Sequence, residues 1–129
     1  MVHTEIKIRG YHLDMFRHVN NARYLEFLEE GRWAFFDANP GFFYRLKGVT
    51  FFVVNININY RRPSSLGDVL DIQTRLSKIG NTSGVLRQEI FEKGTGGLIA
   101  DADVTFVITD AKTQKPLKLK DQLKNTIVS

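Results

Sequence analysis

The stretch Asp14–Asn39, DMFRHVNNARYLEFLEEGRWAFFDAN, holds the only long helical pattern in the sequence. Its apolar residues recur at steps of three and four, so they share one side of a helix: Tyr24, Phe27, Leu28, Gly31, Ala34, Phe35 and Ala38. Asn20 or Asn21 is the expected N-cap, because an Asx side chain accepts a hydrogen bond from a free N–H of the first turn. Pro40 ends the pattern, since proline disfavours helical geometry in the residue before it. We predict a helix of roughly 27 Å, at ~1.5 Å per residue.

Strand patterns surround this helix. Val49–Arg62 begins as a continuous apolar run and then alternates strictly, with Ile56, Ile58 and Tyr60 on one face. Further strands are predicted at Thr4–Arg9, Val69–Ile79, Val85–Glu92 and Leu98–Thr109. Short turns join the later strands, as at GNTSG, residues 80–84. One helix among many strands predicts an α+β fold in which an antiparallel sheet wraps around one long central helix.

Three details of packing follow from the same patterns. Ala100 and Ala102 are among the inward-facing residues of the last strand, and their small side chains should leave room for the helix. Phe42–Tyr44 is expected to cap the open end of the core. The asparagines of Asn55–Asn59 face the other side of the long strand, where a solvated outer face is favoured over a polar strip at a subunit contact.

The composition suits one globular domain, residues 1–129, with a modest core, because 43% of the chain is hydrophobic. The absence of cysteine excludes a disulfide scaffold, a thiolate zinc site and a cysteine nucleophile. The N-terminus has no apolar run of signal-peptide length, and no stretch approaches the ~18 apolar residues of a membrane span. We therefore expect a cytoplasmic protein without membrane insertion.

The net charge of +4 is concentrated in two places. Lysines crowd the segment from Lys112 to Lys124, which Pro116 interrupts and in which only a short helix is expected, and Arg61 and Arg62 end the long strand. No motif places basic and aromatic residues along one groove or helix, so no nucleic-acid partner is expected. Phosphate groups on a small ligand are the more suitable anion.

The polar residues that could take part in a reaction lie within eight positions at the helix start: Asp14, His18, Asn20 and Asn21. A helix start presents free N–H groups and a partial positive charge, which stabilise a carbonyl oxygen as it becomes an oxyanion. Asp14, in the loop before the helix, could act as a general base for water or as a nucleophile on an acyl carbon. A purely structural alternative fits the same residues: Asp14 favours the helix dipole and the asparagines cap the helix.

His18 is interpreted as a loop histidine that hydrogen-bonds to the backbone or orients Asp14. A metal site would need histidines and carboxylates at a characteristic spacing, and neither H-x-x-E-H nor a related pattern occurs. The chain also lacks the G-x-S-x-G elbow, the G-x-G-x-x-G pattern and the P-loop. We therefore expect no metal and no nucleotide cofactor.

Three segments carry a resemblance to a known family. They are YHLDMFRHVNNARYLEFLEEGRW at Tyr11–Trp33, NININYRRPSSLGD at Asn55–Asp68 and DADVTFVITDAKTQK at Asp101–Lys115. In these segments the sequence resembles the hotdog-fold acyl-CoA thioesterases of the 4-hydroxybenzoyl-CoA type, and the likeness runs nearly end to end. The NININYRRP run is similar to the branch that acts on long-chain substrates. The resemblance implies hydrolysis of long-chain fatty acyl-CoA to free fatty acid and CoA, without metal or organic cofactor.

The resemblance also implies roles for the residues around the helix start. Asp14 would be the catalytic carboxylate, and the backbone N–H of Asn21 would polarise the thioester carbonyl. His18 keeps the orienting role inferred above from its place in the loop. Asn20 and Tyr24 are assigned to substrate binding.

Contacts to the CoA part of the substrate are assigned to two other segments. The family's CoA-contacting loop falls on GNTSG, with Thr82 and Ser83 as the candidate contacts. This loop lacks the basic residues that some relatives use for the nucleotide phosphate. Arg61 and Arg62, together with Lys78, could supply that charge, and solvated strand-end residues are the alternative for the two arginines. Arg17 is a second departure, because many relatives have glycine there.

The family's sites lie between two subunits whose sheets join, which implies a homodimer or a homotetramer. A sheet that is large for its single helix also leaves an edge and apolar area uncovered. Other functions remain open: an acyl-CoA-binding protein without hydrolysis, and a thioesterase for an aromatic or short-chain acyl group. Hotdog dehydratase chemistry is a further possibility, but it would want a histidine and a carboxylate facing each other across the dimer.

Overall fold

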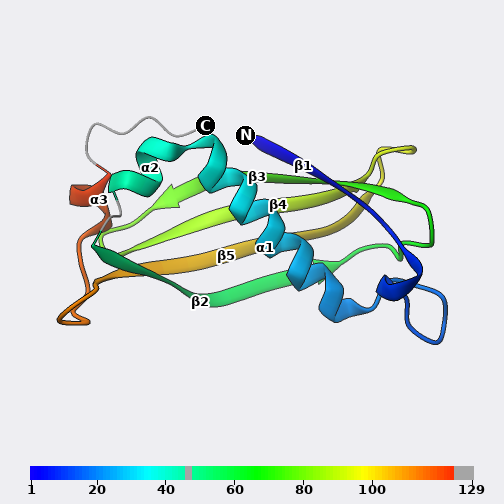
Figure 1. Ribbon diagram of the computed structural model, residues 1–129, viewed down its shortest axis with the longest axis horizontal. Coiled ribbons are helices and arrows are strands. Elements are labelled where there is room, and N and C mark those ends of the chain that lie inside the picture. The colour runs from blue at the N-terminus through cyan, green and yellow to red at the C-terminus, as the bar shows by residue number, and fades with distance from the viewer. Residues whose placement is uncertain (46–47, 124–129) are drawn as a thin grey trace.

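The structure is a computed structural model that describes residues 1–45 and 48–123. In chain order its elements are β1 (Val2–Lys7), η1 (Gly10–His12), α1 (Asn21–Ala38), α2 (Pro40–Arg45), β2 (Val49–Tyr60), β3 (Val69–Ile79), β4 (Ser83–Glu92), β5 (Leu98–Asp110) and α3 (Leu119–Gln122). The strands form one five-stranded antiparallel sheet in the order β1-β3-β4-β5-β2. α1 lies obliquely across one face of this sheet (Figure 1). The predicted α+β arrangement of a sheet against one long helix is confirmed.

Asparagine side chains fix both ends of α1. Oδ1 of Asn20, the N-cap, accepts a hydrogen bond from the N–H of Ala22 at 2.9 Å. At the other end, Nδ2 of Asn39 donates to the carbonyl of Phe35 at 2.9 Å. The helix of 18 residues therefore begins and ends where the sequence predicted.

The buried side of α1 is shorter than the apolar pattern suggested. Five residues of the pattern are buried: Tyr24, Phe27, Leu28, Gly31 and Phe35. Ala34 is only half-buried and Ala38 is exposed, so the pattern overestimated the last turn. That turn faces α2, where the ring of Phe42 lies 5.6 Å from Phe35 and 5.7 Å from Phe36. Aromatic rings, rather than the two alanines, fill this end of the core. The prediction that Phe42 caps the core is confirmed, and the side chains of Phe43 and Tyr44 lie outside what the structure describes.

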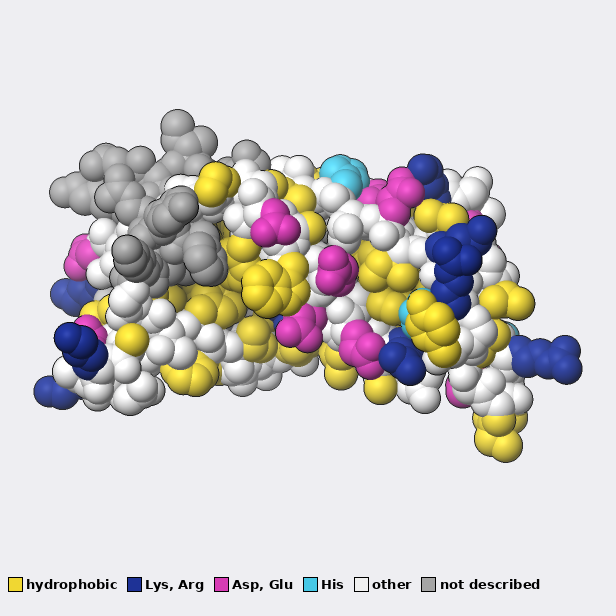
Figure 2. Space-filling view, in the orientation of Figure 1, with side chains coloured by type: hydrophobic (Ala, Val, Ile, Leu, Met, Phe, Trp, Pro, Cys, Tyr) yellow, Lys and Arg dark blue, Asp and Glu magenta, His cyan; other side chains and the backbone are white. Residues whose placement is uncertain are grey.

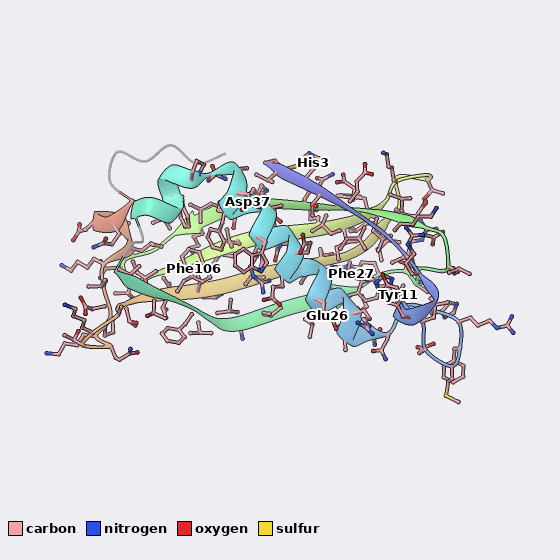
Figure 3. All side chains as sticks on the ribbon, viewed as in Figure 1. His3, Tyr11, Glu26, Phe27, Asp37 and Phe106 are labelled. Carbon is pink, nitrogen blue, oxygen red and sulfur yellow. The ribbon has the colours of Figure 1, made fainter. Side chains whose placement is uncertain are left out.

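The closest approach of α1 to the sheet is at Gly31. A Cβ atom at Gly31 would lie 2.7 Å from Cγ2 of Ile72, 2.8 Å from Nε2 of Gln88 and 2.9 Å from Oγ1 of Thr74. Only glycine allows the helix to come so near the strands. The close contact is therefore over β3 and β4, and not over the alanines of β5 as the sequence suggested. Ala100 and Ala102 do face the core, together with Phe106, and the labelled Phe27 and Phe106 both belong to it (Figure 3).

β2 contains one extra residue that the strand pattern did not reveal. Val53 pairs with Phe106 and Asn55 pairs with Thr105, so Val54 has no partner and forms a β-bulge. The bulge keeps the apolar residues on one face, because each lies opposite an inward-facing residue of β5: Phe51, Val53, Ile56, Ile58 and Tyr60. Without the bulge, Val53 and Ile56 would point to opposite faces.

The inner face of β2 is not covered by the helix. α1 packs against β1 and β3, at the other side of the sheet. In consequence Val53 is 38% exposed and Tyr60 is 44% exposed, although both face the helix layer. Hydrophobic side chains are visible along the middle of this face, with acidic side chains between them (Figure 2). A strip of apolar surface thus runs along β2 beside α1.

The outer face and the chain end complete the fold. The side chains of Asn55, Asn57 and Asn59 are exposed on the outer face of the chain, and Nδ2 of Asn59 donates to Oδ1 of Asp101 at 3.1 Å. The short helix expected in the basic tail is α3, whose buried Leu119 donates its N–H to Asn81 at 2.8 Å. Of the helices in residues 1–45 and 48–123, none is long and apolar enough to cross a membrane.

Candidate active site

The loop before α1 is closed by backbone hydrogen bonds. Leu13 and Val19 form an isolated antiparallel bridge, and the N–H of Asp14 donates to the carbonyl of His18 at 2.9 Å. Val19 in turn donates to the carbonyl of Ser64 at 2.9 Å, which ties the loop to the segment after β2. Arg17 has φ 62°, a conformation that glycine adopts most easily. The residue that departs from many relatives therefore lies where the loop backbone turns.

The carboxylate of Asp14 is held by this loop. Its Oδ1 accepts hydrogen bonds from the N–H groups of Phe16 at 2.8 Å and His18 at 3.4 Å. Within the part of the chain that the structure describes, Oδ2 makes no hydrogen bond. His18 contacts Asp14 through its backbone, while its imidazole makes no hydrogen bond with the described residues. One carboxylate oxygen is thus positioned and the other is free to act.

The first N–H groups of α1 differ in their hydrogen bonding. The N–H of Ala22 is satisfied by the side chain of Asn20, and the N–H of Arg23 donates to the carbonyl of Asn20 at 2.9 Å. The N–H of Asn21 makes no hydrogen bond with any residue in 1–45 or 48–123. An unpaired N–H at the positive end of a helix is suited to receive a carbonyl oxygen or an oxyanion.

A polar pocket of about 280 Å³ joins these groups. Its lining comes from the loop, the start of α1 and the end of β2: Asp14, His18, Val19, Asn21, Tyr24, Tyr60, Arg61, Arg62 and Pro63. Most of the predicted site residues are therefore brought together. Asn20 is not part of the lining, because its side chain caps the helix. We name this cavity the polar pocket.

Tyr24 and Tyr60 connect the polar pocket to the core. The buried hydroxyl of Tyr24 donates to Oγ of Ser64 at 3.0 Å, and burial is the main reason why the pKa of Tyr24 is raised. The hydroxyl of Tyr60 lies 3.4 Å from the carbonyl of Asn21, at the first residue of α1. Tyr60 was not predicted as a site residue, although its place in the alternating strand and next to Arg61 was a usable signal.

The two arginines of the polar pocket have different partners. Nε of Arg61 pairs with Oδ2 of Asp101 at 2.7 Å, and this hydrogen bond is the main cause that lowers the pKa of Asp101. Arg87 approaches Oδ1 of the same carboxylate at 3.5 Å. The guanidinium of Arg62 instead lies against Gly97, where a Cβ atom would overlap it. Arg61 is therefore held by the protein, and Arg62 is the more available cation.

Thr82 and Ser83 do not lie at the polar pocket of the same chain. Thr82 lies in the turn between β3 and β4, and Ser83 is the first residue of β4 and pairs with Val107 near the end of β5. β5 begins beside the polar pocket, where the N–H groups of Arg61 and Arg62 donate to Ile99, so the two places are at opposite ends of the sheet. Lys78 belongs to the same far end as Thr82.

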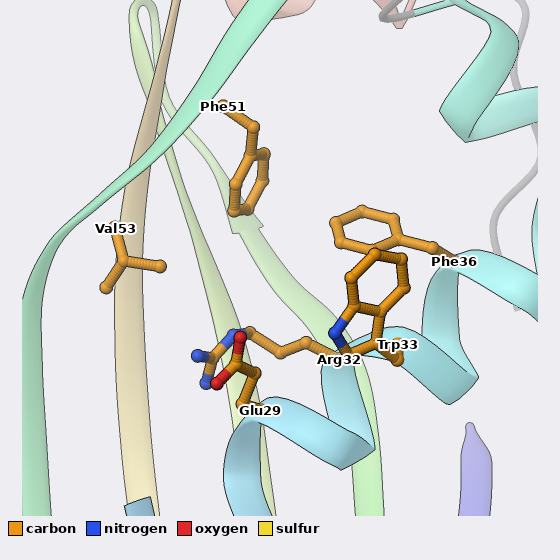
Figure 4. A pocket seen from close by; sticks show the side chains of 6 residues that line it. All are labelled: Glu29, Arg32, Trp33, Phe36, Phe51 and Val53. Carbon is orange, nitrogen blue, oxygen red and sulfur yellow. The ribbon is translucent and has the colours of Figure 1, made fainter. Parts of the chain in front are cut away.

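A second cavity, which we name the apolar pocket, lies further along α1 and β2. It has a volume of about 340 Å³ and its lining comprises Glu29, Arg32, Trp33, Phe36, Phe51 and Val53 (Figure 4). The sequence had not singled out these residues as a site. Their separation in the chain explains this, since α1 supplies four of them and β2 supplies two.

Metal ligands were not expected, and the described residues contain no group of three or more His, Cys, Asp or Glu side chains that could hold a metal ion. The polar pocket offers instead one carboxylate, one free helix-start N–H and two guanidinium groups. These are the parts for polarising a carbonyl group and activating a nucleophile beside it.

The fold and the position of this pocket define a class of domain. A crystal structure named YbaW Probable Thioesterase, from Escherichia coli, superposes with a TM-score of 0.89 at 47% identity, covering 98% of this chain and 99% of that one. A 1,4-dihydroxy-2-naphthoyl-CoA thioesterase from Synechocystis, Slr0204, is only 15% identical but shares the fold, with a TM-score of 0.79 over 94% of this chain and 90% of that one. The architecture is the hotdog fold.

The sequence comparison is more specific. The family model described as Thioesterase-like superfamily matches residues 8–127, and the chain belongs to that superfamily. Over 125 residues it is 50% identical to the Long-chain acyl-CoA thioesterase FadM of Escherichia coli K12. This aligned region covers 96% of this chain and 95% of that protein. The resemblance noted in the sequence is thereby confirmed.

Proposed function

We propose that this protein hydrolyses long-chain fatty acyl-CoA thioesters to free fatty acid and CoA in the cytoplasm. The observation that carries the proposal is that the carboxylate of Asp14 and the unpaired N–H of Asn21 line one pocket at the start of α1. The relative FadM, which is 50% identical and is named a long-chain acyl-CoA thioesterase, supports the substrate class.

The reaction begins with the thioester carbonyl at the helix start. Its oxygen accepts a hydrogen bond from the N–H of Asn21, and the positive end of α1 stabilises the negative charge that develops there. Asp14 takes a proton from a water molecule as the water oxygen bonds to the carbonyl carbon. The tetrahedral intermediate then collapses, the carbon–sulfur bond breaks, and the CoA thiolate leaves and takes up a proton.

A covalent route uses the same two groups. Asp14 would attack the carbonyl carbon itself, expel the CoA thiolate and form a mixed anhydride, which water then hydrolyses. Oδ1 of Asp14 is held by backbone N–H groups, so Oδ2 is the attacking atom in this route and the proton acceptor in the other. A single turnover in oxygen-18 water separates the two routes. Direct attack by water puts the label in the fatty acid, whereas hydrolysis of the anhydride at the carbonyl carbon of Asp14 leaves the label in the protein.

Contacts to CoA are part of the proposal. Arg62 is the better candidate for a phosphate group, since Arg61 is already paired with Asp101. Thr82 and Ser83 lie at the far end of the sheet, so they would reach the CoA part only if a second subunit brings them there. The exposed apolar side chains on the β2 edge support assembly into a homodimer or homotetramer.

Release of free thiol from acyl-CoA tests the function directly. The purified protein is assayed with a thiol reagent against straight-chain acyl-CoA from hexanoyl to stearoyl and against benzoyl-CoA. We expect turnover to be highest with the long chains. Binding of acyl-CoA without thiol release would instead make the chain a non-hydrolytic binding protein, and highest turnover with benzoyl-CoA would assign it to aromatic substrates.

A further inference from the structure

The apolar pocket has the size and lining of a ligand site. Its volume of about 340 Å³ falls within the ~300–1,000 Å³ of small-molecule pockets. Trp33, Phe36, Phe51 and Val53 supply its apolar surface, and Trp33 is 57% exposed at its outer side. No residue proposed above for the reaction lines it, so its role is separate from the chemistry.

The charged residues of this lining do not make it a polar site. Nη1 of Arg32 donates to Oε1 of the buried Gln88 at 3.2 Å, so its guanidinium is engaged by the protein. The side chain is stretched along the pocket beside the carboxylate of Glu29 (Figure 4). In this arrangement Arg32 presents its alkyl stem to the cavity, as long cationic side chains commonly do.

The far end of the apolar pocket is closed by aromatic rings. Phe36 and Phe51 meet edge to face with ring centroids 5.4 Å apart. Phe42 stacks behind Phe36, and Phe106 stacks behind Phe51 at 4.5 Å. Because each ring of the wall is supported by another ring of the core, the wall is a fixed end and not a mobile flap.

The two pockets are joined by the inner face of β2. Tyr60 lines the polar pocket and Val53 lines the apolar pocket, and Ile56 and Ile58 lie between them on the same face. α1 packs toward β1 and β3 and leaves this strip uncovered. The bulge at Val54 is what places all these side chains on one face.

The spacing of the pockets matches a fatty chain. The helical rise of ~1.5 Å per residue puts Glu29, where the lining begins on α1, roughly 12 Å beyond Asn21, and Trp33 roughly 18 Å beyond it. One fatty chain spans about 15 Å, half of the ~30 Å hydrocarbon core of a bilayer. A long chain whose carbonyl is held at Asn21 therefore reaches the apolar pocket, whereas a chain of half that length does not.

We propose that the apolar pocket binds the methyl end of the fatty acyl chain, and that Val53 and Trp33 determine which chain lengths are accepted. The proposal rests on the function proposed above and specifies its substrate. Each methylene placed in this pocket should strengthen binding about fourfold, the usual effect of burying one CH₂ group. Chains that end before the pocket gain none of this increment.

The test measures binding rather than turnover, so that it holds whether or not the protein is an active hydrolase. Non-hydrolysable S-alkyl-CoA thioethers, from hexyl to octadecyl, are titrated below their micelle concentration into the unsubstituted protein, into the Val53 series Ala, Ile and Phe, and into Trp33→Ala. Val53→Phe should lower the ratio of hexadecyl to octyl affinity by at least about tenfold. Val53→Ala and Trp33→Ala should move the preferred length upward.

Phe52→Val is the matched control, because Phe52 is next on the same strand and exposed but does not line the pocket. Its length profile should equal that of the unsubstituted protein. An unchanged hexadecyl-to-octyl ratio in Val53→Phe, in a variant that melts normally, would overturn the inference. An equal loss at every length together with dissociation of the oligomer would also overturn it and would assign the pocket to a subunit contact. Absence of thiol release with a length profile as expected would overturn only the proposed hydrolysis.

Discussion

The polar pocket and the apolar pocket lie along the same helix and the same strand, yet they are built in different ways. At the polar pocket, backbone hydrogen bonds hold a carboxylate beside an unpaired helix-start N–H. At the apolar pocket, rings packed on rings form a closed wall, and the guanidinium of Arg32 is engaged by Gln88. The proposed chemistry thus depends on a short loop, whereas the proposed choice of substrate depends on the core.

This difference allows the two properties to change separately. A substitution in the loop should alter the rate for all chain lengths alike. A substitution on β2 should alter the preference among chain lengths with little effect on the reacting groups. Both pockets depend on how α1 packs against the sheet. A substitution at that contact should therefore change the rate and the chain-length preference together.

The largest expected effect is that of Asp14→Asn. Asn keeps the shape of the side chain and can still accept the hydrogen bond from Phe16, but it cannot take up the proton of water. We expect kcat to fall by about 10³-fold, since positioned general bases contribute ~10²–10⁴-fold. Thiol-release kinetics over the acyl-CoA series measures the loss, which should be the same for long and short chains. Turnover near that of the unsubstituted protein would remove Asp14 from the mechanism.

Gly31→Ala should affect both pockets. A new Cβ would lie within 2.9 Å of atoms of Ile72, Gln88 and Thr74, so α1 has to move away from the sheet. Overpacking of this kind lowers the free energy of unfolding by ~1–3 kcal/mol. Urea unfolding gives the stability, and the kinetic profile should change in both rate and preferred chain length.

Gly41→Ala is the control for that variant, because in the described part of the chain a Cβ there would meet no atom within 4 Å apart from its chain neighbours and the backbone of its own helix. It should be neutral or slightly stabilising, as alanine is favoured over glycine inside a helix. Equal stability of Gly31→Ala and the control would contradict the close contact at Gly31.

Tyr24→Phe should act on the polar pocket alone. The variant removes the buried hydroxyl that donates to Ser64, a hydrogen bond worth about 1 kcal/mol of stability. We expect a loss of that size in urea unfolding and a modest reduction in rate without a change in chain-length preference. Tyr11→Phe, at an exposed tyrosine, is the comparison variant and should be neutral. A shift in preferred chain length for Tyr24→Phe would show that the two pockets are coupled.

The smallest expected effect concerns His12, which is buried behind the start of α1. Its Nδ1 accepts a hydrogen bond from the N–H of Arg9 at 2.9 Å, and burial, followed by the charge of Arg23, lowers its pKa below 6.5. The unfolded chain then binds protons more readily than the folded one, so stability is lost as the pH falls below about 6.5.

His12→Asn keeps an acceptor for Arg9 and removes the titrating group. The difference in melting temperature between pH 7.5 and pH 5, chosen as ~1 unit or more on either side of the ordinary histidine pKa, should become smaller in this variant. An identical pH dependence in both proteins would place the acid sensitivity elsewhere.

The sequence predicted those features that short stretches encode. The helix ends follow from Asn20 and Pro40, and the sheet follows from alternation and short turns. The polar pocket was largely predictable because loop residues and the helix start are neighbours in the chain, so Asp14 and Asn21 cannot lie far apart. Arg61 joins them only through the fold, and the family resemblance supplied that link.

Features that depend on distant residues were missed. The alternation in β2 gave no sign that Val54 is unpaired, because a run of apolar residues precedes it. The close contact at Gly31 involves β3 and β4. Neither the helical periodicity nor the strand alternation alone shows which strand lies beneath the helix. The apolar pocket combines residues from α1 and β2 whose side chains look like ordinary core residues in the sequence.

The unpaired Val54 gives this fold an unusual kind of adjustability. Deleting that one residue would leave Val53, Asn55 and Ile56 in regular alternation, so the side chains on both sides of the bulge would keep their faces. The lining of both pockets would stay on the inner face, and only the local bend and twist of β2 would change. The strand between the two pockets can therefore differ in length by one amino acid while the layout of both pockets is kept.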